Sequence, residues 1–431
     1  MLTWLGVLTI ASVLGLILFR VTSPLVALTL VPVAAAVAGG FAGSVGTFAI
    51  EGMTSVAPVA ALLAFAVIYF GVMHDTGLFE PVIRFVVRHV GRDPVRIALG
   101  TAAIAMISHL DGAGASTFMI TVPAMLPIYR RVGMNPVVLT AATALAAGTM
   151  NMLPWGGPLI RASASLQVAP SSLFVPLLPA MAAGLVTVFL CAFVLGRIER
   201  RSIAAERLPE SMVAGESGAM GTTVARGPRW LFNVALTAVA LIALFANLVP
   251  PAVVFLVASA LAVLVNYPDV GAQRDRVVAH GGTAMMMIST VLAAGVFTGV
   301  LTSSGMLASM AQDLVRVLPP PLLAHLPVAL GILSMPLSLV FDPDSFYFGV
   351  LPVLAHASQA AGGEAVEVGR AAVLGQMTTG FPVSPLTPAT FLLVGLAGVD
   401  LAEHQRKTIP FAFAVTVVMT VVAVFTGAIG L

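Results

Sequence analysis

Charged side chains are scarce in this sequence: Asp, Glu, Lys and Arg make up only 9% of its 431 residues. A soluble domain carries about a quarter charged residues, so this scarcity excludes an ordinary soluble fold. Hydrophobic residues reach 59%, and apolar runs of about 20 residues, long enough to cross a bilayer, recur along the chain. The sequence therefore predicts an all-α polytopic membrane protein.

Cysteine is almost absent as well. The one cysteine, Cys191, lies in an apolar run, which excludes a disulfide framework and a thiolate metal site. The formal net charge is only +2 and no Lys/Arg cluster is interleaved with aromatic residues, so no nucleic-acid partner is expected. The N-terminus has too little positive charge for a signal peptide, and we expect residues 2–19 to form the first span.

A polar stretch at 197–228, rich in Arg, Glu, Ser and Gly, predicts a cytoplasmic linker between two repeats, 1–196 and 229–431. The two halves align at a shift of about 228 residues. Each single match is weak, but three separate landmarks share the shift, which indicates an internal repeat. The landmarks are 71–78 with 299–306, 116–123 with 345–352, and Met150 and Pro154 with Met377 and Pro382.

Each half contains five apolar spans and one further apolar segment that Gly, Pro, Asp and Ser interrupt in its middle. A helix cannot run through such a break in lipid unless the freed backbone groups face protein or water. We therefore expect re-entrant hairpins at about 94–129 and 322–357. Two of the spans are expected to be broken helices, at about 136–169 and 370–396.

Arginine placement predicts the orientation in the cell membrane. With the N-terminus outside, five crossings per half place nearly all basic residues in the cytoplasm, as the positive-inside rule requires. An odd number of crossings inverts the second repeat, so the hairpins enter from opposite sides and the C-terminus also lies outside. Segments 75–92 and 303–317 are amphipathic and are expected at opposite membrane surfaces. The basic residues expected in the cytoplasm are Arg20, Arg84, Arg88, Arg92, Arg96, Arg130, Arg131, Arg197, Arg200, Arg201, Arg207, Arg226, Arg229, Arg274, Arg276, Arg406 and Lys407.

Four interruptions are expected to meet near the middle of the membrane: the hairpin tips at 108–117 and 338–345, and the helix breaks at 151–158 and 379–388. Broken helices expose N-terminal amides that suit an anion, and C-terminal carbonyls that suit a cation. Midplane pairs of this kind mark the binding site in inverted-repeat transporters. The sequence therefore predicts a secondary transporter.

Three intramembrane carboxylates, Asp111, Asp342 and Asp344, are the most informative side chains, because an acidic group in a membrane is costly and marks function. We expect all three to contact a metal ion, and Asp111 and Asp342 to carry protons together with His109. Helix capping is the alternative for Asp111 and Asp344. Arg161, the only basic residue in a membrane-embedded position, either binds a substrate carboxylate or pairs with an aspartate.

Neutral side chains and glycines around the breaks complete the predicted substrate site. Trp155 and Phe381 flank the breaks and are expected to pack, whereas Glu403 and His404 are expected in a solvated loop. The predicted neutral substrate contacts are Ser116, Thr117, Asn151, Gly156, Gly157, Ser345, Ser384, Thr387 and Thr390.

At these residues the sequence resembles the citrate–metal:proton symporter family (CitMHS), within the ion transporter superfamily. The resemblance implies proton-driven uptake of citrate as a complex with a divalent or ferric metal ion, without a prosthetic group. It further implies a homodimer with a fixed scaffold domain and a transport domain that moves as an elevator. The resemblance covers nearly the whole chain, and the stretches that carry it are 108–112, 116–127, 151–158 with Arg161, 376–390 and 395–407.

Other mechanisms remain open from the sequence. A proton- or sodium-coupled carrier of a free di- or tricarboxylate, or of another anion, would use the same helix breaks. A cation/proton antiporter would also suit Asp111 and Asp342. An intramembrane hydrolase is disfavoured because no spacing of a nucleophile and a base is recognisable, so an enzyme is not expected.

Overall fold

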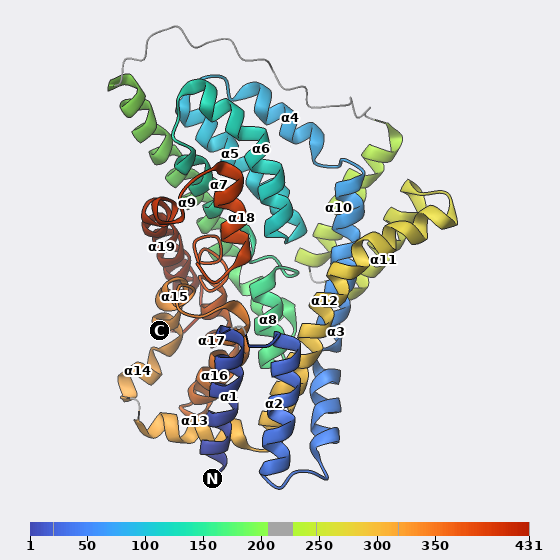
Figure 1. The fold of residues 1–431 in the computed structure, drawn as a ribbon, viewed down its shortest axis with the longest axis vertical. Helices are drawn as coiled ribbons and strands as arrows, with labels where there is room; N and C mark the ends of the chain where they lie inside the picture. The colour runs from blue at the N-terminus through green and yellow to red at the C-terminus, as the bar shows by residue number, and fades with distance from the viewer. Residues whose placement is uncertain (20, 206–226, 247, 318, 431) are drawn as a thin grey trace.

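The predicted all-α class is confirmed, because every regular element that the structure describes is a helix (Figure 1). Residues 206–226 of the predicted linker lie outside the described residues, as does Arg20. The predicted cytoplasmic residues Arg207 and Arg226 fall within that same stretch. The computed structural model describes residues 1–19, 21–205, 227–246, 248–317 and 319–430.

The first half has apolar helices, a short amphipathic helix, a helical hairpin, a broken helix and a long final helix, in that order. The hairpin α5–α6 turns through a short 3-10 segment at His109–Asp111. The broken helix α7–α8 loses its regular conformation over 151–156. The helices are α1 (Leu2–Leu18), α2 (Pro24–Ala38), α3 (Val45–Asp75), α4 (Glu80–His89), α5 (Pro94–Ser108), α6 (Gly114–Val132), α7 (Pro136–Met150), α8 (Gly157–Leu166) and α9 (Pro170–Ala205).

The second half repeats this order of elements, with two differences. A short additional helix precedes the hairpin, and the hairpin's second arm begins as a π-helix at Ser345–Val350. The second break, between α17 and α18, covers 374–387. The helices are α10 (Pro228–Phe245), α11 (Pro251–Asn266), α12 (Val270–Ser303), α13 (Met306–Val317), α14 (Pro320–Ala324), α15 (Leu326–Leu337), α16 (Leu351–Ala360), α17 (Ala365–Val373), α18 (Pro388–Ala397) and α19 (Leu401–Phe425).

Helix starts follow from local chemistry. Asp93 and Asn135 precede a proline, which fits the first helical turn because its missing N–H has no helical partner there. The Asp93 carboxylate accepts a hydrogen bond from the Val95 N–H at 3.1 Å, and the Asn135 amide oxygen accepts one from the Val137 N–H at 2.8 Å. Each side chain thus satisfies an amide that the helix leaves free, which fixes where α5 and α7 begin.

Within the described ranges, four helices, α3, α9, α12 and α19, are long and apolar enough to cross a membrane. Two of these helices from opposite halves, α3 and α12, cross at glycines. A Cβ on Gly52 would lie 2.0 Å from the Gly295 carbonyl oxygen, and a Cβ on Gly299 would lie 2.5 Å from the Phe48 carbonyl oxygen. The backbones of these helices therefore touch, as small residues allow in membrane proteins.

Helices α10 and α11 pack beside this crossing. The Ser259 hydroxyl on α11 donates to the Phe65 carbonyl on α3 at 2.8 Å, and the hydroxyls of Tyr69 and Thr237 lie 2.7 Å apart. In Figure 1, α3, α10, α11 and α12 lie on one side of the molecule, while α9 and α19 lie on the other. The fold thus has two lateral groups of helices.

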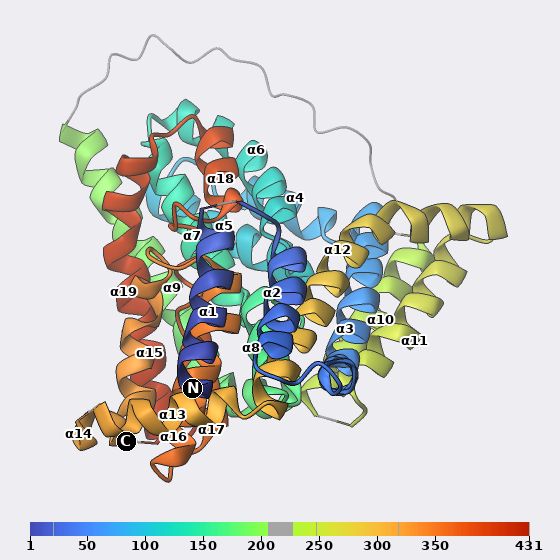
Figure 2. The same ribbon diagram turned by 60° about the horizontal axis from the view of Figure 1, so that its bottom comes forward.

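The two hairpins lie at opposite ends of the molecule. Figures 1 and 2 both show α5 and α6 near the upper end and α16, with α13 and α14, near the lower end. The irregular tips of both hairpins point inward, toward the breaks of α7–α8 and α17–α18. The four interruptions of the sequence therefore converge between the ends.

Candidate functional site

His109, a fully buried side chain, joins the first hairpin tip to the first helix break. Its Nδ1 lies 2.8 Å from Thr117 Oγ1 on α6, and its Nε2 lies 3.3 Å from Asn151 Oδ1 in the break. Trp155 adds a second link, because its Nε1 donates to the Leu110 carbonyl at 2.8 Å. Tip and break thus form one hydrogen-bonded unit.

Asn151 also reaches the second half of the chain. Its Nδ2 donates to the Met377 carbonyl at 2.7 Å, and the Met377 N–H donates to Ser338 Oγ at 3.2 Å. Ser338, in the second tip, donates in turn to Gln376 Oε1 at 2.6 Å. His109, Asn151, Met377 and Ser338 therefore form a polar chain that connects all four interruptions.

Glycine is required where these segments meet. A Cβ on Gly156 would lie 2.0 Å from the Asn151 carbonyl oxygen, and a Cβ on Gly380 would lie 2.2 Å from Ser338 Oγ. Real Cβ atoms do not approach other atoms this closely, so a larger residue at Gly156 would distort the first break, and one at Gly380 would separate the second break from the second tip. Gly156 was predicted to contact substrate, and the structure gives it this packing role.

The carboxylate of Asp111 is hydrogen-bonded within the first tip. The Ala113 N–H donates to its Oδ1 at 2.8 Å, and the Ser116 hydroxyl donates to its Oδ2. Gly112, between them, has a φ of +72°, a conformation that favours glycine. Both carboxylate oxygens therefore already have a partner within the tip, although neither accepts from a first-turn amide of α6, which begins without a side-chain cap.

In the second tip the capping residue is Asp342. Its Oδ1 accepts hydrogen bonds from the N–H groups of Asp344 at 3.0 Å and Ser345 at 3.2 Å. Its Oδ2 and the Ser345 hydroxyl are buried and have no hydrogen-bond partner among the described residues. Because an unpaired buried carboxylate oxygen is costly, this is where the tip would best accommodate a cation or a proton.

Asp344 faces the first break rather than capping a helix, so the capping interpretation of this residue was wrong. Its Oδ1 lies 2.6 Å from Arg161 Nε, and the two side chains are 15% and 20% exposed. Arg161 Nη1 donates to the Gly157 carbonyl at 3.3 Å and lies 3.6 Å from Met377 Sδ. Of the two roles open to Arg161, the structure shows the pairing with an aspartate.

The hydroxyls at the second break donate to the backbone of the break itself and of the second tip. Thr387 and Thr390 both donate to the Phe381 carbonyl, at 2.5 and 2.8 Å, and Ser384 donates to the Ser338 carbonyl at 2.6 Å. These groups hold the irregular backbone in shape. Helix α8 begins without a side-chain cap, as α18 does. Of the first three residues of α8, Gly157 and Leu159 carry an N–H and Pro158 does not.

The three aspartates do not form a metal centre. Each has its own surroundings, and no group of three His, Cys, Asp or Glu side chains able to hold a metal ion occurs in the described ranges. A metal ion bound beside one of these aspartates would take its other ligands from backbone carbonyls, neutral side chains or another molecule.

His404 was expected in a solvated loop, and this was wrong. It lies in α19 and is fully buried. Its Nδ1 lies 3.0 Å from Thr140 Oγ1 on α7, and its Nε2 lies 2.9 Å from the Pro382 carbonyl in the second break. A helical stripe signals this position, because His404, Thr408 and Ala412 recur every four residues and are all buried.

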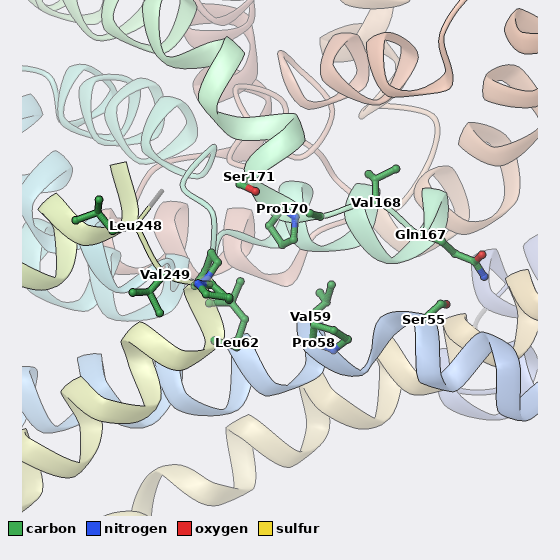
Figure 3. A pocket seen from close by; sticks show the side chains of 14 residues that line it. Ser55, Pro58, Val59, Leu62, Gln167, Val168, Pro170, Ser171, Leu248 and Val249 are labelled. Carbon is green, nitrogen blue, oxygen red and sulfur yellow. The ribbon is translucent and has the colours of Figure 1, made fainter. Parts of the chain in front are cut away.

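A cavity of about 460 Å³ lies elsewhere, between α3, the α8–α9 loop and the α10–α11 loop. Figure 3 shows its lining, in which Pro58, Leu62, Val168 and Leu248 are apolar. It contains none of the polar-chain residues and no carboxylate or guanidinium. Its chemistry does not suit an anionic or metal-bound substrate.

Comparison with known proteins identifies the family of this chain. Residues 7–375 match the sequence profile of CitMHS, described as citrate transporter. The chain belongs to the CitMHS family of citrate transporters. A citrate transporter of Bacillus subtilis (strain 168) is 43% identical and a Mg(2+)/citrate complex secondary transporter of that organism is 37% identical, each over 100% of both chains. Membership of CitMHS makes this chain a membrane transporter rather than an enzyme.

Two solved structures are similar to this chain in fold. The YdaH transporter of Alcanivorax borkumensis has a TM-score of 0.63 at 14% identity, with 90% of this chain and 89% of that chain covered. MtrF of Neisseria gonorrhoeae, from a class of antimetabolite efflux pumps, has a TM-score of 0.61 at 12% identity, with 92% and 86% covered. At these identities the likeness concerns the fold alone.

Proposed function

We propose that this protein takes up citrate as its complex with a metal ion, by symport with protons. The observation that carries the proposal is the meeting of all four interruptions in one polar chain, beside three carboxylates and one guanidinium. The 37% identical Mg(2+)/citrate complex secondary transporter supports a metal complex as the substrate. Mg²⁺, Ca²⁺ and Fe³⁺ are the candidate metal ions.

Citrate carboxylates bind at the uncapped start of α8 and beside Arg161 in this proposal. The N-terminal amides and dipole of α8 attract an anion, and Arg161 adds the one positive side chain. Asp342 and Asp111 lie in the two tips, where they face the metal ion of the complex. The remaining predicted contacts, Ser116, Thr117, Asn151, Gly156, Gly157, Ser345, Ser384, Thr387 and Thr390, shape these two regions.

His109 is suited to carry a proton. In its neutral form, Nε2–H donates to Asn151 Oδ1 and the Thr117 hydroxyl donates to Nδ1. In its charged form Nδ1–H donates to Thr117, whose hydroxyl turns to the Ala113 carbonyl at 2.9 Å. Both forms therefore find partners without a backbone shift, as a proton-coupling group requires.

The architecture proposed for this function has two inverted repeats, 1–196 and 229–431. The repeated order of helices and the opposite placement of the hairpins support it. The hairpins and broken helices then move as a transport domain against a scaffold that includes α3, α10, α11 and α12. The working unit is a homodimer in the cell membrane, with both termini outside.

The test is uptake of radiolabelled citrate into proteoliposomes under an inward proton gradient, without metal and with Mg²⁺, Ca²⁺ or Fe³⁺. Uptake that requires one of these ions and collapses when the gradient is dissipated is the expected result. Equal uptake without metal would instead indicate a free-carboxylate carrier. Metal flux without any citrate uptake would indicate a cation/proton antiporter.

A further inference from the structure

The charges of the candidate site do not suit a free polyanion. The two tips and two breaks carry three carboxylates, Asp111, Asp342 and Asp344, and one guanidinium, Arg161. Free citrate is a trianion near neutral pH, whereas its Mg²⁺ complex is a monoanion. A site with more negative than positive groups repels the trianion more strongly, especially where little water screens the charges.

The one positive group is also partly occupied. A carboxylate is held best by two parallel N–H groups of a guanidinium. In Arg161 the Nε–H is taken by Asp344 at 2.6 Å, and Nη1 is turned to the Gly157 carbonyl and to Met377 Sδ. Only Nη2 has no partner among the described residues, so the Nε–Nη2 pair cannot grip a substrate carboxylate while Asp344 is in place.

We propose that Asp344 is a specificity-determining residue: by occupying Arg161, it excludes free citrate and makes the site selective for citrate whose charge a metal ion has lowered. The inference rests on the proposed function and names a group that sets its substrate form. Asp344 acts through Arg161 and is thus a positioning residue. It need not contact the metal ion itself.

The contacts of Asp344, Asp342 and Asp269 predict different effects on citrate binding when each is replaced by Asn. Asp344→Asn removes the charge that neutralises Arg161 and weakens its hold on Nε–H, so the guanidinium becomes free to bind a carboxylate. Asp342→Asn removes a carboxylate that the proposed function places against the metal ion, so it weakens binding of the complex but leaves the Arg161–Asp344 pair intact. Asp269→Asn is the matched control, because Asp269 is an exposed cap of α12, and Asn caps equally well.

The experiment measures equilibrium binding of citrate to the purified full-length protein, once with excess EDTA and once with saturating Mg²⁺. The wild type should bind the Mg²⁺ complex much more tightly than free citrate. In Asp344→Asn this preference should fall by about tenfold or more, the scale of one unit charge near contact. That fall should come from tighter binding of free citrate. Asp342→Asn should weaken binding of the Mg²⁺ complex and raise free-citrate binding far less, and Asp269→Asn should change neither.

Two further variants make the result decisive. Asp344→Glu keeps a carboxylate on Arg161 and should keep the wild-type preference. Arg161→Gln added to Asp344→Asn should abolish the gain in free-citrate binding, because that gain requires the guanidinium. An unchanged preference in Asp344→Asn, or an equal gain in free-citrate binding in Asp342→Asn, would overturn the proposal.

The same series of variants distinguishes a loss of folding from a loss of citrate selectivity. Melting temperatures identify any variant that fails to fold, and if Asp344→Asn is one, Asp344→Glu decides: a lost preference there contradicts the inference. A wild type that binds citrate in neither form refutes the proposed function. A wild type that selects the Mg²⁺ complex, with Asp344→Asn unchanged, refutes only the role of Asp344.

Discussion

Single side chains hold the site together by satisfying polar atoms across the gaps between helices. The amide of Asn151 serves both halves of the chain, since its oxygen meets His109 and its nitrogen meets the Met377 carbonyl. Buried polar groups of this kind cost little while paired and much when one partner is removed. The site is therefore sensitive to substitutions that never touch substrate.

Replacing Asn151 by Ala should lower both stability and citrate binding. The change leaves the Met377 carbonyl and one ring nitrogen of His109 without a partner, at a cost of roughly 1–3 kcal/mol. Thermal unfolding and citrate binding in detergent measure the two effects. Asn266→Ala is the matched control, because Asn266 makes comparable contacts to Asn233 and to the Ala262 carbonyl in the other helix group. If both variants impaired citrate binding equally, the polar chain would have no special role.

Gly380→Ala should separate the second break from the second tip. Its Cβ would lie 2.2 Å from Ser338 Oγ, so one of the two segments must move, at a cost of about 1–3 kcal/mol. Gly395→Ala offers the comparison, since nothing lies within 4 Å of a Cβ there. Melting temperatures and citrate uptake should fall for Gly380→Ala only. Unimpaired uptake in that variant would show that the contact is dispensable.

At this scale the sequence reveals which residues matter more readily than what they contact. Asp111, Asp342, Asp344 and Arg161 stand out because charges are rare in apolar segments. Their partners depend on how the two halves pack, so capping could not be assigned to Asp342, nor the ion pair to Asp344. His404 was misplaced because the charged residues around it resemble a loop.

Among the helices, α3 and α12 form the tightest contact between the two halves. Gly52, Gly295 and Gly299 bring their backbones together without intervening side chains. Such contacts maximise van der Waals packing where lipid offers no hydrophobic driving force. The crossing is therefore suited to a part of the protein that keeps its shape.

Gly52→Ala should force α3 and α12 apart, because its Cβ would overlap the Gly295 carbonyl at 2.0 Å. We expect a lower melting temperature in detergent, by several degrees for a loss of about 1–3 kcal/mol. Gly46→Ala on the same helix should have no such effect, since its Cβ would meet nothing within 4 Å. Equal melting temperatures for the two variants would contradict the tight crossing.

Interruptions of helices are easier to predict than helix geometry. Gly, Pro and Asp within apolar segments mark places where a helix cannot continue, and the chain does break at 109–113, 151–156, 338–344 and 374–387. Nothing in the sequence indicates that the arm after the second tip begins as a π-helix. That conformation depends on how Ser345 to Val350 pack, since five of these six residues are buried.

Over the whole molecule, the order of helices repeats while the hairpins lie at opposite ends. The orientation inferred from arginine placement stays a prediction. The fold class could be predicted because apolar runs and repeats are properties of the chain itself. The polar chain between the halves could not, because it joins residues as far apart as Asn151 and Met377.

Single cysteines at Arg92 and Ala361 should be labelled from opposite sides of the membrane. Both positions are exposed, next to the first and second hairpin respectively, and Cys191 is buried enough to leave a low background. An impermeant maleimide applied to intact cells should label Ala361→Cys at once, but Arg92→Cys only after permeabilisation. Labelling of both from the same side would contradict the inverted arrangement.

The polar chain also has a consequence for biosynthesis. Asn151 and its partner Met377 are 226 residues apart, and a ribosome adding roughly 5–20 residues per second needs on the order of ten to forty seconds to make that stretch. During this interval the nascent first half is in the membrane, and Asn151 Nδ2 still lacks its Met377 partner. The binding site is thus among the last features to form, and a prematurely terminated chain would leave unpaired polar groups in lipid for membrane proteases to recognise.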